Sequence, residues 1–141
     1  MSTREQAVAE AMTWLRTPYQ HRAAVKGAGV DCAQLLIEVF SAIGKIEKFD
    51  VGYYPHDWHL HRDEERYLGW IKQYSTQVDQ PKPGDVALFK FGRCVSHGAI
   101  VVAWPTVIHA FWRQGCVLAD ADNGVELKGR LDSFWSLWGN E

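Results

Sequence analysis

Three side chains of this 141-residue sequence are suited to nucleophilic chemistry: Cys32, His97 and His109. Cys32 directly follows Asp31, a residue type that often caps the start of a helix. Because unpaired backbone N–H groups and the helix dipole make such a start electropositive, we expect a lowered pKa for the Cys32 thiol. The alternative interpretation is a small buried hydrophobic residue, the role that we expect for Cys94 and Cys116.

A nucleophilic thiol needs a base, and two histidines are placed to provide one. His97 and His109 lie in apolar runs on either side of Trp104-Pro105, where a turn is expected. A turn centred there puts both imidazoles on one face of neighbouring antiparallel strands, in diagonal positions. One imidazole would then accept the thiol proton and the other would orient it. The alternative is two unrelated histidines at a sheet edge.

Helical periodicity is confined to the first half of the chain. Ser2 and Glu5 form a capping-box pattern, and the helix after them is expected to end before Pro18. A second helix is expected to start after Asp31 and to stop at Gly44. Its buried face would carry Leu35, Leu36, Val39, Phe40 and Ile43. The other expected elements of this half are a loop over 19–30 and a helix over 62–74.

Strand patterns begin after Pro81–Gly84, where proline and glycine mark a boundary. The predicted strands cover 85–91, 95–102, 106–112 and 116–119, and the tail 131–138 is expected to add a short helix or strand. Helices followed by an antiparallel sheet predict one α+β domain over residues 1–141.

Composition excludes several classes of protein. Fifteen basic and 17 acidic residues give a net charge of −2, which disfavours nucleic acid as the partner. The three cysteines show no Cys-x-x-Cys spacing, so we expect neither a disulfide framework nor a zinc site, and no cofactor. No apolar run reaches the roughly 20 residues of a membrane span. The first residues show no signal region, so we expect synthesis in the cytoplasm.

Two further groups of side chains have residue types that could form sites. A cluster of His56, Asp57, His59, His61 and Asp63 contains zinc-ligand types and could bind a metal or substrate. Strict ligand spacing is missing, so we expect a solvated loop. Four tryptophans are expected to pack in the core rather than to bind sugars: Trp104, Trp112, Trp135 and Trp138.

Several short motifs, taken in order, resemble the NlpC-type cysteine peptidases, a branch of the papain-like superfamily. The motifs are Thr17-Pro18-Tyr19, Gly29-Val30-Asp31-Cys32, Pro83-Gly84-Asp85-Val86, Ser96-His97-Gly98 and Ile108-His109-Ala110. The resemblance covers roughly residues 14–112, and the order Cys, His, His and the spacing of the histidines follow the family pattern. It implies a papain-like fold with N-terminal helices packed on a central antiparallel sheet.

Members of that family cut stem peptides of bacterial cell walls, typically between D-glutamate and diaminopimelate or lysine. By position, Cys32 resembles the nucleophile, His97 the base and His109 the orienting residue. Tyr19 resembles an auxiliary hydroxyl beside the nucleophile, and the Cys32 backbone N–H would help to stabilise an oxyanion. Asp31 and Ser96 lie within the motifs and are expected to be auxiliary or substrate-binding residues.

The sequence departs from the family at two places. Ala33-Gln34 replace the usual Ser-Gly after the nucleophile, and 21–24 replace the usual Gly-Gly. Residues 25–34 resemble the phage-tail branch, including enzymes of prophages and gene transfer agents, which implies tail proteins as partners and a tail-associated enzyme acting on the cell wall. Two alternatives stay open: a non-catalytic tail or assembly protein that keeps the fold, and an amidase or acyltransferase that uses the same triad.

Overall fold

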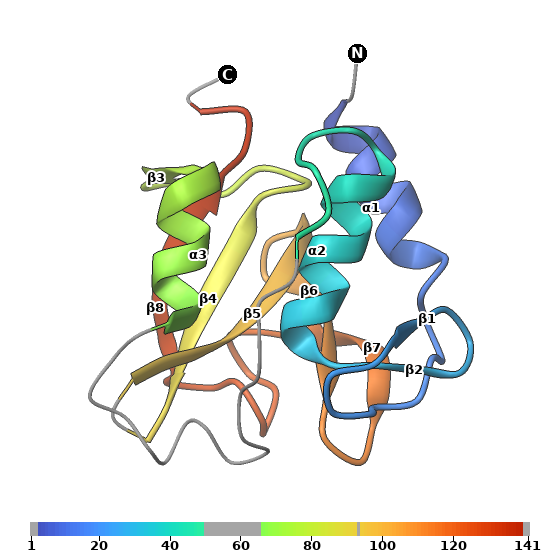
Figure 1. The fold of residues 1–141 in the computed structure, drawn as a ribbon. Coiled ribbons are helices and arrows are strands. Elements are labelled where there is room, and N and C mark those ends of the chain that lie inside the picture. The colour runs from blue at the N-terminus through green and yellow to red at the C-terminus, as the bar shows by residue number, and fades with distance from the viewer. Residues whose placement is uncertain (1–2, 50–65, 93, 140–141) are drawn as a thin grey trace.

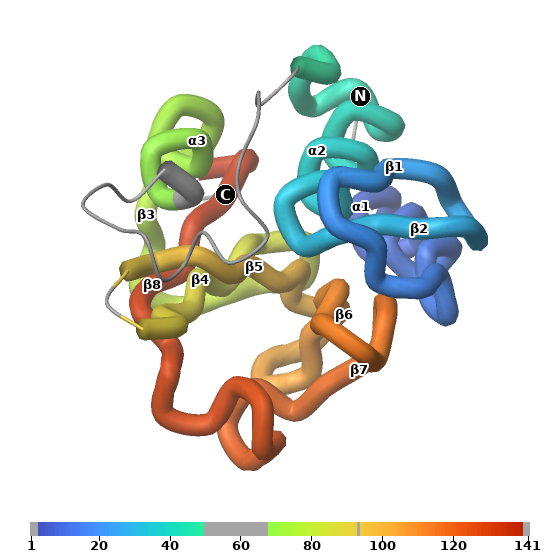
Figure 2. Tube along the Cα trace, turned by 60° about the horizontal axis from the view of Figure 1, so that its bottom comes forward, coloured from blue at the N-terminus to red at the C-terminus, as the bar shows by residue number. Residues whose placement is uncertain are grey.

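A computed structural model describes residues 3–49, 66–92 and 94–139 of the chain. Its helices are α1 (Arg4–Met12), α2 (Cys32–Ala42) and α3 (Arg66–Tyr74), and they lie on one side of a curled antiparallel sheet (Figures 1 and 2). Six strands form this sheet in the order β3-β8-β4-β5-β6-β7. Their bounds are β3 Thr76–Val78, β4 Val86–Phe91, β5 Cys94–Ala103, β6 Thr106–Phe111, β7 Gly115–Asp120 and β8 Leu131–Ser136. The α+β class expected from the sequence is confirmed.

The start of α2 has the expected cap. Asp31 has an extended backbone, and its side chain accepts a hydrogen bond of 2.9 Å from the backbone N–H of Gln34. The helix ends at the cap residue Ile43, and Gly44 follows with φ +81°, as expected for a glycine C′ position. Local sequence chemistry therefore determines both ends of the helix that carries Cys32.

The capping box of α1 lies one residue later than predicted. Thr3, rather than Ser2, is the N-cap: its hydroxyl accepts from the backbone N–H of Gln6, and the Gln6 side chain accepts from the Thr3 N–H at 2.8 Å. A threonine–glutamine pair makes the same two bonds as the predicted serine–glutamate pair, which is why the pattern allowed both registers. The helix also ends at Met12, earlier than the proline suggested.

Two apolar clusters hold the layers together. The α2 side chains Leu35, Leu36, Val39 and Phe40 are buried, as predicted, against the strand residues Val86, Leu88, Ile100 and Ile108. Alternate residues of the same strands, with Ala121 and Leu127 from the segment after β7, form a second cluster on the other face of the sheet: Ala87, Phe89, Ala99, Val101, Val107, Ala121 and Leu127. Strands β4, β5 and β6 are therefore buried on both faces.

Three short strands and the place of β8 were not predicted. The loop expected over 19–30 contains a two-stranded ribbon, β1 (Ala24–Val25) with β2 (Gly29–Val30), and β3 lies in a stretch assigned no element. The tail is a strand, and β8 inserts between β3 and β4. Strands of two or three residues carry too little periodicity for detection, and their pairing is long-range.

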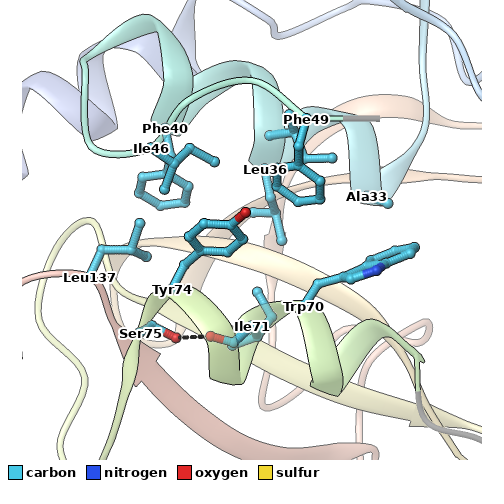
Figure 3. Close-up of a pocket in the computed structure, with 11 residues that line it drawn as sticks. Ala33, Leu36, Phe40, Ile46, Phe49, Trp70, Ile71, Tyr74, Ser75 and Leu137 are labelled. Atoms are coloured by element: carbon cyan, nitrogen blue, oxygen red, sulfur yellow. Dashed lines mark hydrogen bonds between the residues drawn. The ribbon is translucent and has the colours of Figure 1, made fainter. Parts of the chain in front are cut away.

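Helix α3 lies opposite α2, and the two helices face each other across an apolar pocket (Figure 3). Phe49 and Tyr74 stack there, with ring centroids 5.1 Å apart. Leu68, Ile71 and Tyr74 of this helix are half-buried. The pocket begins at Ala33, the neighbour of Cys32, so an apolar wall adjoins the candidate nucleophile.

One of the four predicted core tryptophans is in fact at the surface. Trp135 and Trp138 are buried and Trp104 is partly buried, but Trp112 is 54% exposed. It lies in the turn between β6 and β7, where the Arg113 guanidinium lies 4.3 Å from its ring centroid. Among the described residues, no helix combines the length and the apolar character needed to cross a bilayer.

The segment that leads to Tyr19 is attached to the edge of β7. The Cys116 N–H donates to the Thr17 carbonyl at 2.8 Å, and the Arg16 N–H donates to the Cys116 carbonyl at 2.9 Å. Gly115, with φ +81°, allows this approach, because a Cβ there would lie 2.6 Å from the Thr17 oxygen. A side chain at position 115 would push the segment away.

Gly115→Ala is expected to lower the free energy of unfolding by more than the cost of a positive φ alone, which is about 1 kcal/mol. Gly44→Ala is the matched control, because Gly44 has the same φ of +81° and open space around its Cβ position. Urea denaturation of both variants measures the difference. Equal losses in the two variants would show that the Thr17–Cys116 contact does not need a glycine.

Candidate active site

Cys32 is the first residue of α2, and its thiol lies against the backbone of β5 on both sides of His97. The Cys32 Sγ is 3.8 Å from the Ser96 carbonyl oxygen, and a hydrogen bond from the Gly98 N–H also reaches the sulfur. The β5–β6 ladder runs from Ala103 to Ile100 on β5, so these groups lie beyond its end. Backbone polar groups point along the plane of a sheet. The thiol therefore lies at the open edge of β5.

The two histidines are directly paired. His97 Nε2 lies 2.8 Å from His109 Nδ1, with ring centroids 5.0 Å apart. Ile100 lies opposite Ile108, so the two histidines are in diagonal positions on one face, as predicted from the turn at Trp104-Pro105. The expected register is thus confirmed, while contact of the thiol with the His97 ring and the catalytic roles stay predictions.

Burial keeps both imidazoles neutral. His97 is 6% exposed and His109 is fully buried, among the rings of Phe89, Phe91 and Phe111. Loss of solvation lowers the pKa of His97 well below its usual value, and His109 beside it adds to the effect. Burial lowers the pKa of His109 to about 4, although the carboxylate of Glu126 acts in the opposite direction. The contact between the two rings is therefore a hydrogen bond between neutral imidazoles, in which one ring nitrogen donates and the other accepts.

The expected lowering of the Cys32 pKa is wrong. Three backbone N–H groups do lower it, those of Gly98, Ala33 and Cys32 itself. Burial, followed by the nearby charge of Asp31, raises the pKa by more, so the net shift is well above the usual range. The N–H groups at the helix start lower the pKa of the thiol, as predicted, but the sequence pattern gave no measure of how deeply the thiol is buried. The resting site holds a neutral thiol and neutral imidazoles.

Tyr19 belongs to the segment that pairs with Val30, two residues before Cys32, and a place for its hydroxyl beside the thiol stays a prediction. Its segment runs along β2: the Val30 N–H donates to the Pro18 carbonyl at 3.0 Å, and the Gln20 N–H donates to the Val30 carbonyl at 3.1 Å. Burial raises the pKa of Tyr19 far above its usual value, and the charges of Cys32 and Asp31 raise it further. The hydroxyl therefore stays protonated, and its role as a hydrogen-bond donor stays a prediction.

Asp31 and Ser96 are the remaining residues that the sequence predicts for the site. Asp31 is 1% exposed, and its second oxygen accepts from the Arg22 N–H at 2.7 Å, so its carboxylate holds the backbone around Cys32. Ser96 is buried and contributes its carbonyl. Substrate contacts of Asp31 and Ser96 stay predictions.

The histidine cluster over 56–63 falls outside the described residues and stays a prediction. Within the described ranges, no three His, Cys, Asp or Glu side chains lie close enough to hold a metal ion.

Sequence reasoning missed two contributors to this site. Gly98 supplies its N–H to the thiol, and Glu126 acts electrostatically on His109. The contribution of Gly98 is a backbone N–H, which no side-chain pattern in the sequence indicates. Its position directly after His97 is the only signal that could have identified it. Glu126 lies 17 residues beyond His109 in the numbering, in a loop without a motif. Only the tertiary fold brings it near.

The stability of the protein is expected to fall as pH falls from 6.5 toward 4. An unfolded imidazole binds a proton below about pH 6.5, whereas folded His109 does so only near 4. In this interval the unfolded chain binds more protons, so the free energy of unfolding decreases by about 1.4 kcal/mol per buried histidine and pH unit. Urea denaturation at pH 7 and 5.5 measures it. His109→Gln should lose less stability over the same interval, and an equal loss would contradict this assignment.

No family model matches the chain, and no curated protein matches it. Solved structures do match. The NlpC/p60 domain of the peptidoglycan hydrolase SagA superposes with a TM-score of 0.62 at 20% identity, over 95% of this chain and 98% of that chain. An NlpC/p60 family protein from Bacillus cereus superposes with a TM-score of 0.67 at 16% identity, over 94% of this chain and 39% of that chain. NlpC1 from Trichomonas vaginalis superposes with a TM-score of 0.62 at 15% identity, over 96% of this chain and 45% of that chain.

The chain spans less than half the length of the last two proteins. These similarities cover nearly the whole chain at low identity, so they establish the architecture. The fold of this chain is that of NlpC/p60 domains, as the sequence motifs implied.

Proposed function

We propose that this chain is a single-domain cysteine peptidase that hydrolyses peptidoglycan stem peptides between D-glutamate and diaminopimelate or lysine. One observation carries the proposal: the Cys32 thiol lies against the backbone on both sides of His97, while His97 is paired with His109 at 2.8 Å. In this proposal Cys32 of α2 is the nucleophile, His97 of β5 the base and His109 of β6 the orienting group. The similarity to the domain of a peptidoglycan hydrolase supports the substrate class.

The pairing of the histidines determines which nitrogen acts as the base. His97 Nε2 is engaged with His109 Nδ1, so His97 Nδ1 is the nitrogen left to accept the thiol proton. This requires a hydrogen on His97 Nε2, which donates to His109. In the proposed mechanism His97 Nδ1 accepts this proton when the sulfur attacks the substrate carbonyl.

The reaction then follows acyl transfer. Sulfur bonds to the carbonyl carbon, and the carbonyl electrons move to oxygen, which in this proposal accepts hydrogen bonds from the N–H at the start of α2 and from the Tyr19 hydroxyl. Collapse breaks the carbon–nitrogen bond, and His97 gives its proton to the leaving amine. Water next attacks the thioester, His97 accepts a proton from it, and the Cys32 thiol is restored.

Delivery by a phage tail or gene-transfer-agent tail is part of the proposal. It rests on the resemblance of residues 25–34 to the phage-tail branch, and the partners would be tail proteins. In the fold this segment forms the β1–β2 ribbon and the start of α2, beside the candidate nucleophile. It is therefore suited to contact both the substrate and neighbouring tail proteins.

Cys32→Ala and His97→Ala are expected to abolish cleavage of purified stem peptides, lowering the rate by about 10⁴-fold or more, because nucleophile and base act as one unit. Mass spectrometry of the peptides after incubation measures the products. Cys94→Ala is the matched control, since Cys94 and Cys32 are both 6% exposed. It should retain full activity.

The same experiment separates the alternatives. Cleavage that survives Cys32→Ala would contradict the mechanism. Intact substrate with the wild-type protein would favour the non-catalytic tail protein. Release of the complete stem peptide from its sugar would indicate an amidase instead of a peptidase.

Tyr19→Phe is expected to lower kcat by about 10- to 100-fold while KM changes little, because the lost donor acts on charge that develops in the transition state. Tyr74→Phe is the control: Tyr74 lines the apolar pocket between α2 and α3 and should retain wild-type kcat. Steady-state kinetics on a stem-peptide fragment measure both variants. An unchanged kcat in Tyr19→Phe would remove the hydroxyl from the mechanism.

A further inference from the structure

Phe91 joins the histidine pair to a cation at the surface. Its ring meets the His97 ring edge-on, with centroids 5.4 Å apart, and its centroid lies 5.9 Å from that of Phe111. The guanidinium carbon of Arg130 lies 4.3 Å from the centroid of the same Phe91 ring. Phe91 is half-buried, whereas Arg130 is exposed. One aromatic side chain therefore separates an exposed positive charge from the candidate base.

The backbone of β4 holds Arg130 in this place. Strand β4 changes register twice, against β8 between Leu88 and Phe89 and against β5 between Phe89 and Lys90. Next to these bulges the Lys90 N–H donates to the Arg130 carbonyl at 2.8 Å, and the Arg130 guanidinium donates to the Lys90 carbonyl at 3.5 Å. Bulges are frequent beside active sites, where they re-aim side chains. The guanidinium is therefore positioned by a carbonyl and by a ring.

No carboxylate among the described residues forms an ion pair with Arg130. Asp132, the acid closest to it in sequence, lies 3.8 Å from Lys90 Nζ instead. A guanidinium has five N–H donors in a planar fork that matches the two oxygens of a carboxylate. The Lys90 carbonyl accepts from one of its nitrogens, Nη1. Further donors of this side chain are therefore available to a carboxylate of a bound molecule.

The substrate proposed above carries such a group close to the bond that is cut. A glutamate that forms a peptide bond through one carboxyl group keeps the other as a free carboxylate. The two carboxyl carbons are four bonds apart, which is about 5 Å when the side chain is extended. A scissile carbonyl at the Cys32 thiol thus brings this carboxylate within reach of a cation that lies one ring away from His97.

We propose that Arg130 is a substrate-binding residue: its guanidinium, held on the Phe91 ring beside His97, binds the free carboxylate of the glutamate on the acyl side of the scissile bond. The inference rests on the proposed peptidase function for the identity of its substrate. It adds a selectivity that the triad alone does not supply. A stem peptide with this carboxylate is preferred over the same peptide with a carboxamide in its place.

Calorimetry with the Cys32→Ala protein tests binding without turnover. The two ligands are a stem-peptide fragment with the free glutamate carboxylate and the same fragment with a carboxamide there. We expect the carboxylate fragment to bind about 5- to 30-fold more tightly, because a charge-assisted pair is lost with the carboxamide. Adding Arg130→Gln should remove this preference, and Arg130→Lys should keep part of it, since lysine retains the charge without the planar fork. An unchanged preference in Arg130→Gln, or no binding of either fragment, would overturn the proposal.

Arg113→Gln is the matched control for the loss of one positive charge. The Arg113 guanidinium also lies 4.3 Å from the centroid of an aromatic ring, that of Trp112, and both residues are exposed. This variant should keep the preference for the carboxylate fragment. A loss as large as that in Arg130→Gln would indicate a general effect of net charge and would contradict the assignment of Arg130.

Kinetics with the active protein separate this inference from the proposed function. Arg130→Gln should raise KM for the carboxylate fragment by about 5- to 30-fold with little change in kcat, because the ion pair forms equally in the bound substrate and in the transition state. Cleavage with an unchanged KM would refute the role of Arg130 and leave the peptidase standing. A binding preference that depends on Arg130, in a wild-type protein that cleaves neither fragment, would support the binding site and refute the peptidase.

Discussion

One apolar face of α2 lies against β5 and β6, and the position of every reactive group depends on this contact. A helix is stiff over three turns, so burying Leu35, Val39 and Phe40 also determines where its first residue lies. That residue, Cys32, reaches the edge of β5 just beyond the end of the β5–β6 ladder. The packing that stabilises the core therefore also positions the candidate nucleophile beside the backbone of His97.

The same burial determines the charge state of the site. Loss of solvation raises the pKa of the Cys32 thiol and lowers the pKa of both imidazoles, so the neutral forms prevail. A neutral buried thiol is less exposed to oxidation than a thiolate. The consequence is that the buried thiol and both imidazoles carry no charge near neutral pH.

Long-range contacts hold the N-terminal part of the chain over the site. Arg4 on α1 forms an ion pair of 2.6 Å with Asp85, which is 1% exposed, and also donates to Ser136 on β8. Thr17 pairs with β7, and the segment after it runs along β2. These contacts join the first 20 residues to the start of β4, to β8 and to the edge strand β7, and they hold the segment of Tyr19 along the residues just before Cys32.

The sequence alone determined the features that depend on neighbouring residues. The Asp31 cap, the Gly44 stop and the apolar face of α2 follow from local chemistry, and period-two alternation around a Trp104-Pro105 turn was enough to pair His97 with His109. Tertiary structure decided what depends on distant residues: the insertion of β8 between β3 and β4, the exposure of Trp112, the raised pKa of Cys32 and the effect of Glu126 on the pKa of His109. The physical reason is that caps and periodicity act within a few residues, whereas solvation and Coulomb interactions depend on every group that the fold brings close.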